Sequence, residues 1–196
     1  GGRGAFALPH GRYQVFVSHG PEWTLHTETL TIGTKPVELV TTLEHVVDVP
    51  GFVTADFHVH AAPSWDSKVP LSARVLEFLA EDVKVLVATD HNVITDYRGE
   101  IDKADASQEL DTVAGAEIST TDWGHFGAYP MKLDPNWWVL HGVRTTGLPA
   151  RDLLRALRQR DPAAIICVNH PRLGKLGYFN IGGFAPKVAR FLTPQA

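Results

Sequence analysis

The chain opens with apolar and polar residues in alternation over residues 11–20, the pattern of a half-buried strand. A Gly-Pro turn follows, and two further β-rich runs occupy residues 24–33 and 37–47. Strands separated by turns and without helices are typical of a β-sandwich. Three strands are too few to close one. Residues 1–46 are therefore predicted to be the C-terminal part of a β-sandwich-like domain that begins further upstream.

The spacing of apolar residues changes after Pro50-Gly51, where helical patterns begin to alternate with strand patterns. Residues 71–82 place apolar side chains on one helical face, and residues 149–162 read as a helix that starts near Pro149 and stops at Asp161-Pro162. Strands and helices that alternate in this way predict an α/β domain with parallel strands over residues 47–196. The predicted strands lie at 52–60, 83–91, 111–119, 125–131 and 163–171.

Four of these predicted strands begin with an apolar run and end in residues that can bind metals. Active sites of α/β proteins collect at the carboxyl ends of parallel strands, so the side chains should meet at one face. Each one alone has an ordinary explanation, such as a surface histidine, a loop cap or an ion-pair partner. As a set they predict a metal centre. The residues are His58 and His60, Asp90 and His91, Glu117, and His170.

Composition narrows the function classes. The 196 residues carry 18 Lys and Arg against 22 Asp and Glu, a net charge of -4 that argues against nucleic-acid binding. No apolar run is long enough to cross a bilayer, so no membrane insertion is expected. Cys167 is the only cysteine, which rules out an internal disulfide and a multi-cysteine zinc site; we expect it to be a small buried apolar side chain. The chain has ten histidines, and this number favours a metal-binding protein because histidine is the commonest metal ligand.

These motifs, taken in order, resemble the PHP (polymerase and histidinol phosphatase) superfamily of metal-dependent hydrolases. The resemblance covers residues 50–196, and the sequence that leads into it looks most similar to the CehA/McbA-like branch. The matching motifs are DFHVH at 56–60, ATDHN at 88–92, GAEIS at 115–119, HFGAY at 125–129 and NHPR at 169–172.

The resemblance implies a distorted (β/α)7 barrel that holds two or three divalent ions of zinc, manganese or iron. The HxH pair would bind one ion and Glu117 would bridge two. The family's last motif, Asp-x-His, is absent before Ala196. We therefore expect a barrel truncated at its C-terminus, with the final ligands beyond the chain. The implied metal ligands are His58, His60, Asp66, His91, Glu117, His125 and His170.

Nitrogen and oxygen donors together suit zinc, manganese or iron(II) better than calcium. The predicted chemistry is attack by a metal-bridging hydroxide, with phosphoesters as the first choice of substrate. Glu117, Asp90 and Arg172 are the predicted catalytic residues. Asp90, like Asp56, would orient a ligand histidine or cap a loop, and Arg172 would clamp a phosphate or lie on the surface.

Two alternatives stay open. The same centre could serve a carboxylic ester, amide or carbamate hydrolase, or the chain could be a non-catalytic binding module with a degenerate site. Trp137 and Trp138 would form an apolar substrate wall or pack in the core, and His141 is expected to be structural or to lie near the rim of the pocket. A small-molecule substrate is the expected partner. The oligomeric state and the localisation stay open, although the β-rich leader is compatible with an extracytoplasmic protein by analogy.

Overall fold

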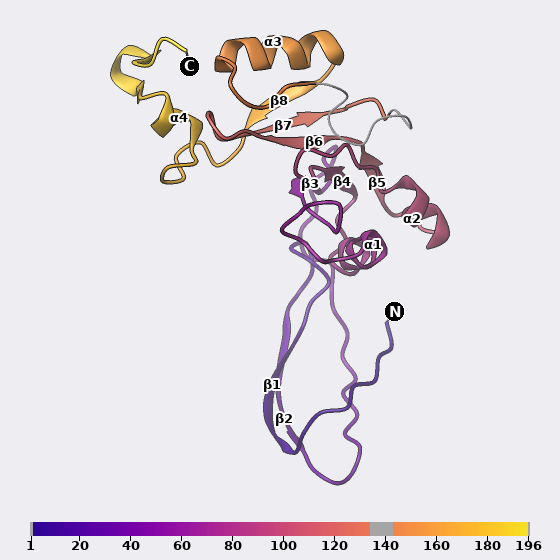
Figure 1. Ribbon diagram of the computed structural model, residues 1–196. Coiled ribbons are helices and arrows are strands. Elements are labelled where there is room, and N and C mark those ends of the chain that lie inside the picture. The colour runs from indigo at the N-terminus through magenta and orange to yellow at the C-terminus, as the bar shows by residue number, and fades with distance from the viewer. Residues whose placement is uncertain (1, 134–142, 196) are drawn as a thin grey trace. The chain divides into compact units, whose positions relative to one another are not determined.

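The structure is a computed structural model that describes residues 2–133 and 143–195 (Figure 1). Trp137, Trp138 and His141 lie outside the described residues. The chain divides into two compact units. The first comprises Gly1–Phe52 and Ala80–Asp82, and the second comprises Val53–Leu79 and Val83–Ala196. Every residue predicted for the metal centre belongs to the second unit.

The first unit contains one antiparallel hairpin. Strand β1 (Gly11–Val17) pairs with β2 (His26–Ile32) along its whole length. The predicted third strand at 37–47 is wrong, because this stretch forms only an isolated bridge between His45 and Trp23. Its valines are largely exposed, so no apolar packing holds the segment as a strand. The sandwich-like origin of residues 1–46 stays a prediction.

A parallel sheet begins the second unit, as the sequence predicts. Its order is β3 (Ala55–Val59), β4 (Val85–Ala88) and β5 (Asp111–Val113). Helix α1 (Leu71–Ala80) connects β3 to β4, and α2 (Arg98–Lys103) precedes β5. The central strand β4 is buried, whereas the edge strand β3 is exposed except at Val59. The side of α1 that carries Val75 and Phe78 packs into the core of this sheet.

The second sheet is antiparallel, which corrects the prediction of parallel strands throughout. Its order is β6 (Ala116–Ser119), β7 (His125–Tyr129) and β8 (Ile165–Val168). Only residues 120–124 join β6 to β7, and a parallel crossover needs a connection of a dozen residues or more. The short link therefore imposes a hairpin.

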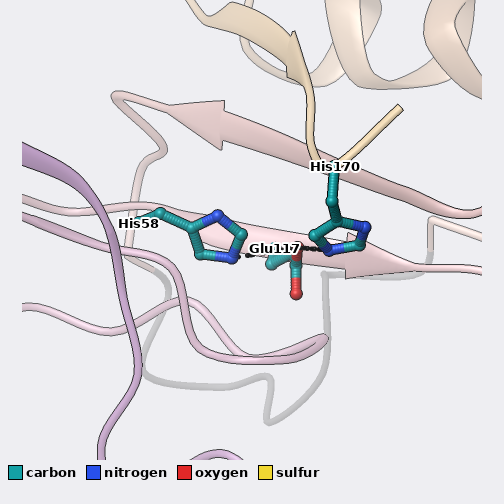
Figure 2. Close-up of side chains that lie close together, drawn as sticks. All are labelled: His58, Glu117 and His170. Atoms are coloured by element: carbon teal, nitrogen blue, oxygen red, sulfur yellow. Dashed lines mark hydrogen bonds and ion pairs between the residues drawn. The ribbon is translucent and has the colours of Figure 1, made fainter. Parts of the chain in front are cut away.

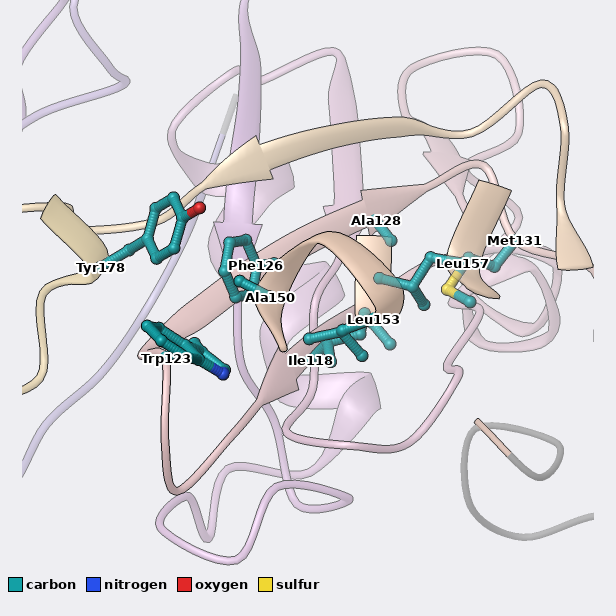
Figure 3. Close-up of a cluster of buried hydrophobic side chains, with 10 residues drawn as sticks. Ile118, Trp123, Phe126, Ala128, Met131, Ala150, Leu153, Leu157 and Tyr178 are labelled. Carbon is teal, nitrogen blue, oxygen red and sulfur yellow. The ribbon is translucent and has the colours of Figure 1, made fainter. Parts of the chain in front are cut away.

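Helix α3 (Ala150–Arg160) packs on this antiparallel sheet and has the bounds that the sequence predicts. Figure 3 shows the buried cluster that results, with Leu153 of α3 beside Ile118 of β6 and Ala150 of α3 beside Phe126 of β7. Cys167 is exposed, so the expectation of a buried thiol is wrong. It lies on β8, an outer strand on which exposed and half-buried residues alternate.

The predicted strand at 111–119 is divided between the two sheets. Its first half is β5 and its second half is β6, and Gly115 lies between them. A Cβ atom at Gly115 would come within 2.7 Å of the backbone oxygens of both Ala88 and Ala128. A residue without a side chain is therefore required where the chain passes from one sheet to the other.

The described residues form four separate sheets and not the complete (β/α)7 barrel that the resemblance implies. The chain continues after β8 through α4 (Tyr178–Ile181), β9 (Phe184–Ala185), a 3-10 turn (Pro186–Val188) and β10 (Arg190–Phe191). None of the described helices is both long and apolar enough to cross a membrane.

Candidate metal centre

Glu117 is a fully buried carboxylate surrounded by imidazoles. Figure 2 shows His58 and His170 reaching its carboxylate from two sides and from different parts of the chain. Their Nε2 atoms lie 3.1 and 3.2 Å from Glu117 Oε1. Three more nitrogens surround Oε2: His91 Nδ1 at 2.9 Å, His125 Nδ1 at 3.3 Å and His60 Nε2 at 3.7 Å.

The two sheets explain why these histidines meet. His58 is the last residue but one of β3 and His91 follows β4, and these strands are parallel neighbours. His125 begins β7, which places it opposite Ser119 at the end of β6 because the pair is antiparallel. His170 comes just after β8. An isolated parallel bridge between His91 and Glu117 connects the two sheets at this point.

The donor atoms fall into three groups, and within each group they lie no more than 4.8 Å apart. Glu117 and His91 each belong to two groups. Neighbouring cations would share the Glu117 carboxylate, whereas a neutral imidazole such as His91 has one lone pair for one cation. All seven residues predicted as ligands occur in the groups, and their role as ligands stays a proposal. The groups are His58, Glu117 and His170; His91, Glu117 and His125; and His60, Asp66 and His91.

His58 and His60 lie in different groups, which differs from the implied binding of one ion by the HxH pair. A register shift between Asp56 and Val59 interrupts the strand alternation that would align the two rings. His60 also lies beyond the end of β3. The two rings are consequently tilted by 47° to each other, with centroids 5.0 Å apart.

The electrostatics of the centre favour a charged carboxylate. Burial by itself would raise the pKa of Glu117, but the contacts with His125, His58 and the amide of Asn169 outweigh burial and lower it. The interaction with Glu117 raises the pKa of His58, whereas burial lowers the pKa of His60. Glu117 is thus a buried anion that needs positive charge around it.

The polar atoms without partners fit a cation. Glu117 Oε2 and the Nδ1 atoms of His125 and His170 are buried and make no hydrogen bond. His125 Nδ1 is 3.3 Å from Glu117 Oε2 but is not aligned for one. Buried polar atoms are normally satisfied, so Glu117 Oε2 and His125 Nδ1, which face each other, are suited to a shared metal ion. The residues present therefore fit divalent metals.

Asp56 and Asp90, the two aspartates predicted to orient a ligand histidine or cap a loop, make different contacts. Asp56 Oδ1 accepts a hydrogen bond from the backbone N–H of His58 at 2.9 Å, which agrees with the loop-capping alternative. Asp90 is fully buried, and its Oδ1 accepts from Ala61 N–H at 2.7 Å and from Ser64 Oγ at 2.8 Å. Among the described residues, the Asp90 carboxylate makes no hydrogen bond to a histidine ring. It is linked to the ring of His60 through the Ser64 hydroxyl.

A cavity of about 450 Å³ opens over the centre. It is within the usual size range of small-molecule sites. Besides the seven donor residues it is lined by Trp65, Leu173 and Leu176. Trp65 is 79% exposed, and its ring stacks on His91 with centroids 5.2 Å apart. The cavity thus combines a polar floor with an apolar side.

Arg172 is not part of the cavity lining. Its guanidinium lies 5.5 Å from the centroid of the Phe179 ring. Its predicted role as a phosphate clamp stays a prediction that this position does not favour. Lys175 is exposed and does not line the cavity either.

Sequence reasoning missed Ser64, Trp65 and Asn169. Ser64 and Trp65 lie within the loop between His60 and Asp66, and Asn169 directly precedes His170. The only feature of the sequence that could have identified these three residues is that each lies next to, or in the loop between, predicted metal ligands. Asn169 Nδ2 donates to Glu117 Oε1 at 2.8 Å, which identifies it as a partner of the central carboxylate.

Among known proteins, similarity to this chain is found in solved structures. No protein-family model matches the chain, and no curated protein matches it. One of these structures is a two-domain protein from Bacteroides vulgatus ATCC 8482, described as containing a predicted PHP-like metal-dependent phosphoesterase. The match has a TM-score of 0.48 and 21% sequence identity, and covers 81% of this chain. The chain matches 44% of the length of that protein.

Proposed function

We propose that this protein is a metal-dependent hydrolase, with phosphoesters as its first candidate substrates. The observation that carries the proposal is the convergence of seven nitrogen and oxygen donors, five of them imidazoles, around or beside the buried Glu117 carboxylate. A purely structural histidine cluster would satisfy its buried nitrogens by hydrogen bonds. Here His125 Nδ1 and Glu117 Oε2, which lie 3.3 Å apart at the centre, make none.

The donor chemistry suits a borderline transition metal such as zinc, manganese or iron(II). Divalent ions bound here would supply a water nucleophile of lowered pKa and positive charge for an oxyanion that develops on the substrate. Glu117 belongs to two donor groups, so its two oxygens would hold neighbouring ions together. His91 belongs to two groups as well, because its Nε2 faces Asp66 and its Nδ1 faces Glu117. A neutral imidazole has a single lone pair, so His91 would bind one ion and carry a hydrogen on its other nitrogen.

Charge favours an anionic substrate. Two divalent ions would bring four positive charges, and the carboxylates among the cavity residues, Glu117 and Asp66, supply two negative ones. The loaded cavity would therefore remain positive and attract a phosphoester. Asp66 has 42% of its side chain exposed, which puts its carboxylate where a substrate can approach.

One observation favours a second candidate. None of the described residues that line the cavity is Lys or Arg, whereas Trp65, Leu173 and Leu176 give it an apolar side. An uncharged ester, amide or carbamate with an apolar substituent would suit that side. The metal centre would serve both reactions, because a nucleophilic water can attack either phosphorus or a carbonyl carbon.

The decisive experiment is a substrate panel measured on the purified protein with added Mn²⁺ or Zn²⁺ and after chelation. p-Nitrophenyl phosphate represents the phosphoester candidate, and p-nitrophenyl acetate and a 1-naphthyl carbamate represent the second. We expect metal-dependent turnover of the phosphoester, lost in His58→Ala. Turnover of the acetate or carbamate alone would favour the second candidate. Absence of bound metal would overturn both and favour a binding module.

A further inference from the structure

The Ser64 hydroxyl lies at a buried junction between the two segments that carry the first three predicted histidines. Its side chain is nearly inaccessible, with the residue only 2% exposed. Ser64 Oγ is 2.9 Å from His60 Nδ1, 2.8 Å from Asp90 Oδ1 and 3.0 Å from the backbone nitrogen of His91. The hydroxyl therefore contacts the segment after β3 and the segment after β4 at once.

The direction of each hydrogen bond can be assigned by counting protons. Asp90 Oδ1 already accepts the N–H of Ala61, so the hydrogen between Asp90 and Ser64 comes from the Ser64 hydroxyl. Ser64 Oγ then has only lone pairs for its other partners. One accepts the backbone N–H of His91, and the other faces His60 Nδ1.

This count fixes the tautomer of His60. Because Ser64 Oγ can only accept, Nδ1 of His60 carries the hydrogen. The lone pair of the neutral ring is then on Nε2. That nitrogen faces the centre, because it lies 3.7 Å from Glu117 Oε2, and His60 belongs to the donor group formed with Asp66 and His91. A ligand histidine is commonly oriented in this way by the partner of its second nitrogen.

We propose that Ser64 is a positioning residue that fixes the Nδ1–H tautomer of His60 and thereby prepares Nε2 to bind a metal ion. The part of the proposal that concerns metal rests on the proposed metal centre. Ser64 also holds its own loop, because its backbone nitrogen donates to Ala61 and its backbone oxygen accepts from Ser67. The hydroxyl itself contacts two members of a single donor group, the ring of His60 and the backbone N–H of His91.

A nucleophilic role for Ser64 does not fit this arrangement. A catalytic serine needs a base that removes its proton and a path for the substrate. The Ser64 proton points to Asp90, which reaches no histidine except through Ser64, and the hydroxyl is buried. Histidine here donates to serine, which is the opposite of the direction in a nucleophilic pair.

The first test measures the tautomer in metal-free protein. Long-range ¹H–¹⁵N correlations distinguish Nδ1–H from Nε2–H imidazoles, and the His60 signals can be identified by their loss in His60→Gln. We expect Nδ1–H in the wild type and in Ser64→Thr, which keeps a hydroxyl, and a shift towards Nε2–H in Ser64→Ala. An Nε2–H ring in the wild type overturns the proposal, and this result needs no variant to fold.

The second test measures metal affinity by titration with Co²⁺, followed by its visible absorption and by calorimetry. We expect Ser64→Ala to weaken one class of sites by about 10–100-fold, the usual effect of losing such a partner. Ser67→Ala is the matched control, because Ser67 is in the same loop and its hydroxyl accepts only from Val69 N–H, at 3.4 Å. Equal Co²⁺ affinities in the wild type and in Ser64→Ala would overturn the part of the proposal that concerns metal binding by His60. If the wild type binds no metal, the proposed function fails, while the tautomer still decides the role of Ser64.

Discussion

His91 and Glu117 are joined through both their backbones and their side chains. Their backbones form an isolated parallel bridge, and His91 Nδ1 lies 2.9 Å from Glu117 Oε2. The backbone N–H of Glu117 also donates to the carbonyl of Asp90, next to His91. Since His91 follows β4 and Glu117 lies on β6, this pair connects the parallel sheet to the antiparallel one. The candidate centre is thus located where the two sheets meet.

Replacing Glu117 by Gln should abolish stabilisation by metal. Gln keeps the shape of the side chain but removes the buried charge that two donor groups share. In the wild type, metal at 100 times its Kd should add about 2.7 kcal/mol to the free energy of unfolding. This corresponds to a rise in Tm of roughly 5–10 °C for a domain of this size. Thermal unfolding followed by circular dichroism, with Zn²⁺ and with a chelator, measures the difference.

Asp111→Asn is the control for this prediction. Asp111 is an exposed carboxylate that pairs with Arg98 outside the centre, so its loss should leave the metal-induced rise in Tm intact. A Glu117→Gln protein that is stabilised by metal as strongly as the wild type would show that ions bind elsewhere or not at all.

The number of bound ions should fall further in His91→Ala than in His170→Ala. His170 belongs to one donor group, whereas His91 belongs to two and uses a different nitrogen toward Asp66 and toward Glu117. We expect His170→Ala to retain more metal per chain at a fixed free Zn²⁺ concentration. Elemental analysis after gel filtration measures this ratio. Equal losses in the two variants would show that membership of two donor groups does not make His91 more important than His170 for metal binding.

Trp65→Ala should raise KM for substrates with an aromatic group more than for their alkyl counterparts. Trp65 lines the cavity, is 79% exposed and stacks on His91, so its outer face is open to a planar group. Loss of one aromatic contact of about 1–1.5 kcal/mol corresponds to a change of roughly 5–10-fold. Steady-state kinetics on paired aryl and alkyl substrates measures the effect. Trp65→Phe should largely restore the wild-type KM, and identical changes for both substrate types would exclude a contact with the aromatic group.

Helices α1 and α3 and most of the donor set were predictable from the sequence because they depend on local patterns, whereas the short helices α2 and α4 were not predicted. Periodic apolar residues predict α1 and α3, and the structure confirms both. Histidines and acids at the ends of apolar runs predict His58, His60, His91, Glu117 and His170, whereas Asp66 and His125 came from the family resemblance. Even the wrong assumption of parallel strands did not displace His125, because the start of an antiparallel β7 lies beside the end of β6.

Other features depend on contacts that no local pattern encodes. The division of residues 111–119 between two sheets follows from the close approach of backbone at Gly115. The separation of His58 from His60 follows from the register shift in β3. The Ser64 hydroxyl becomes informative only when Asp90, 26 residues later in the chain, is seen to accept its hydrogen. Long-range packing decides each of these.

Gly115→Ala should destabilise the second unit, because Gly115 is where the chain passes from β5 to β6. The new Cβ would lie 2.7 Å from the backbone oxygens of Ala88 and Ala128, and neither atom is the end of a flexible side chain. Strands of both sheets would have to move apart, at a cost of about 1–3 kcal/mol or more. Because Ala116 and Glu117 follow directly, metal affinity should fall with stability.

Urea unfolding of Gly115→Ala, compared with Gly99→Ala, tests this expectation. Gly99 is in helix α2, and a Cβ there would meet nothing within 4 Å. Alanine at that position should leave stability unchanged or raise it by up to about 1 kcal/mol, because alanine favours a helix over glycine. If both variants unfold at the same urea concentration as the wild type, the two sheets do not approach each other closely at Gly115. The position of Glu117 would then need another explanation.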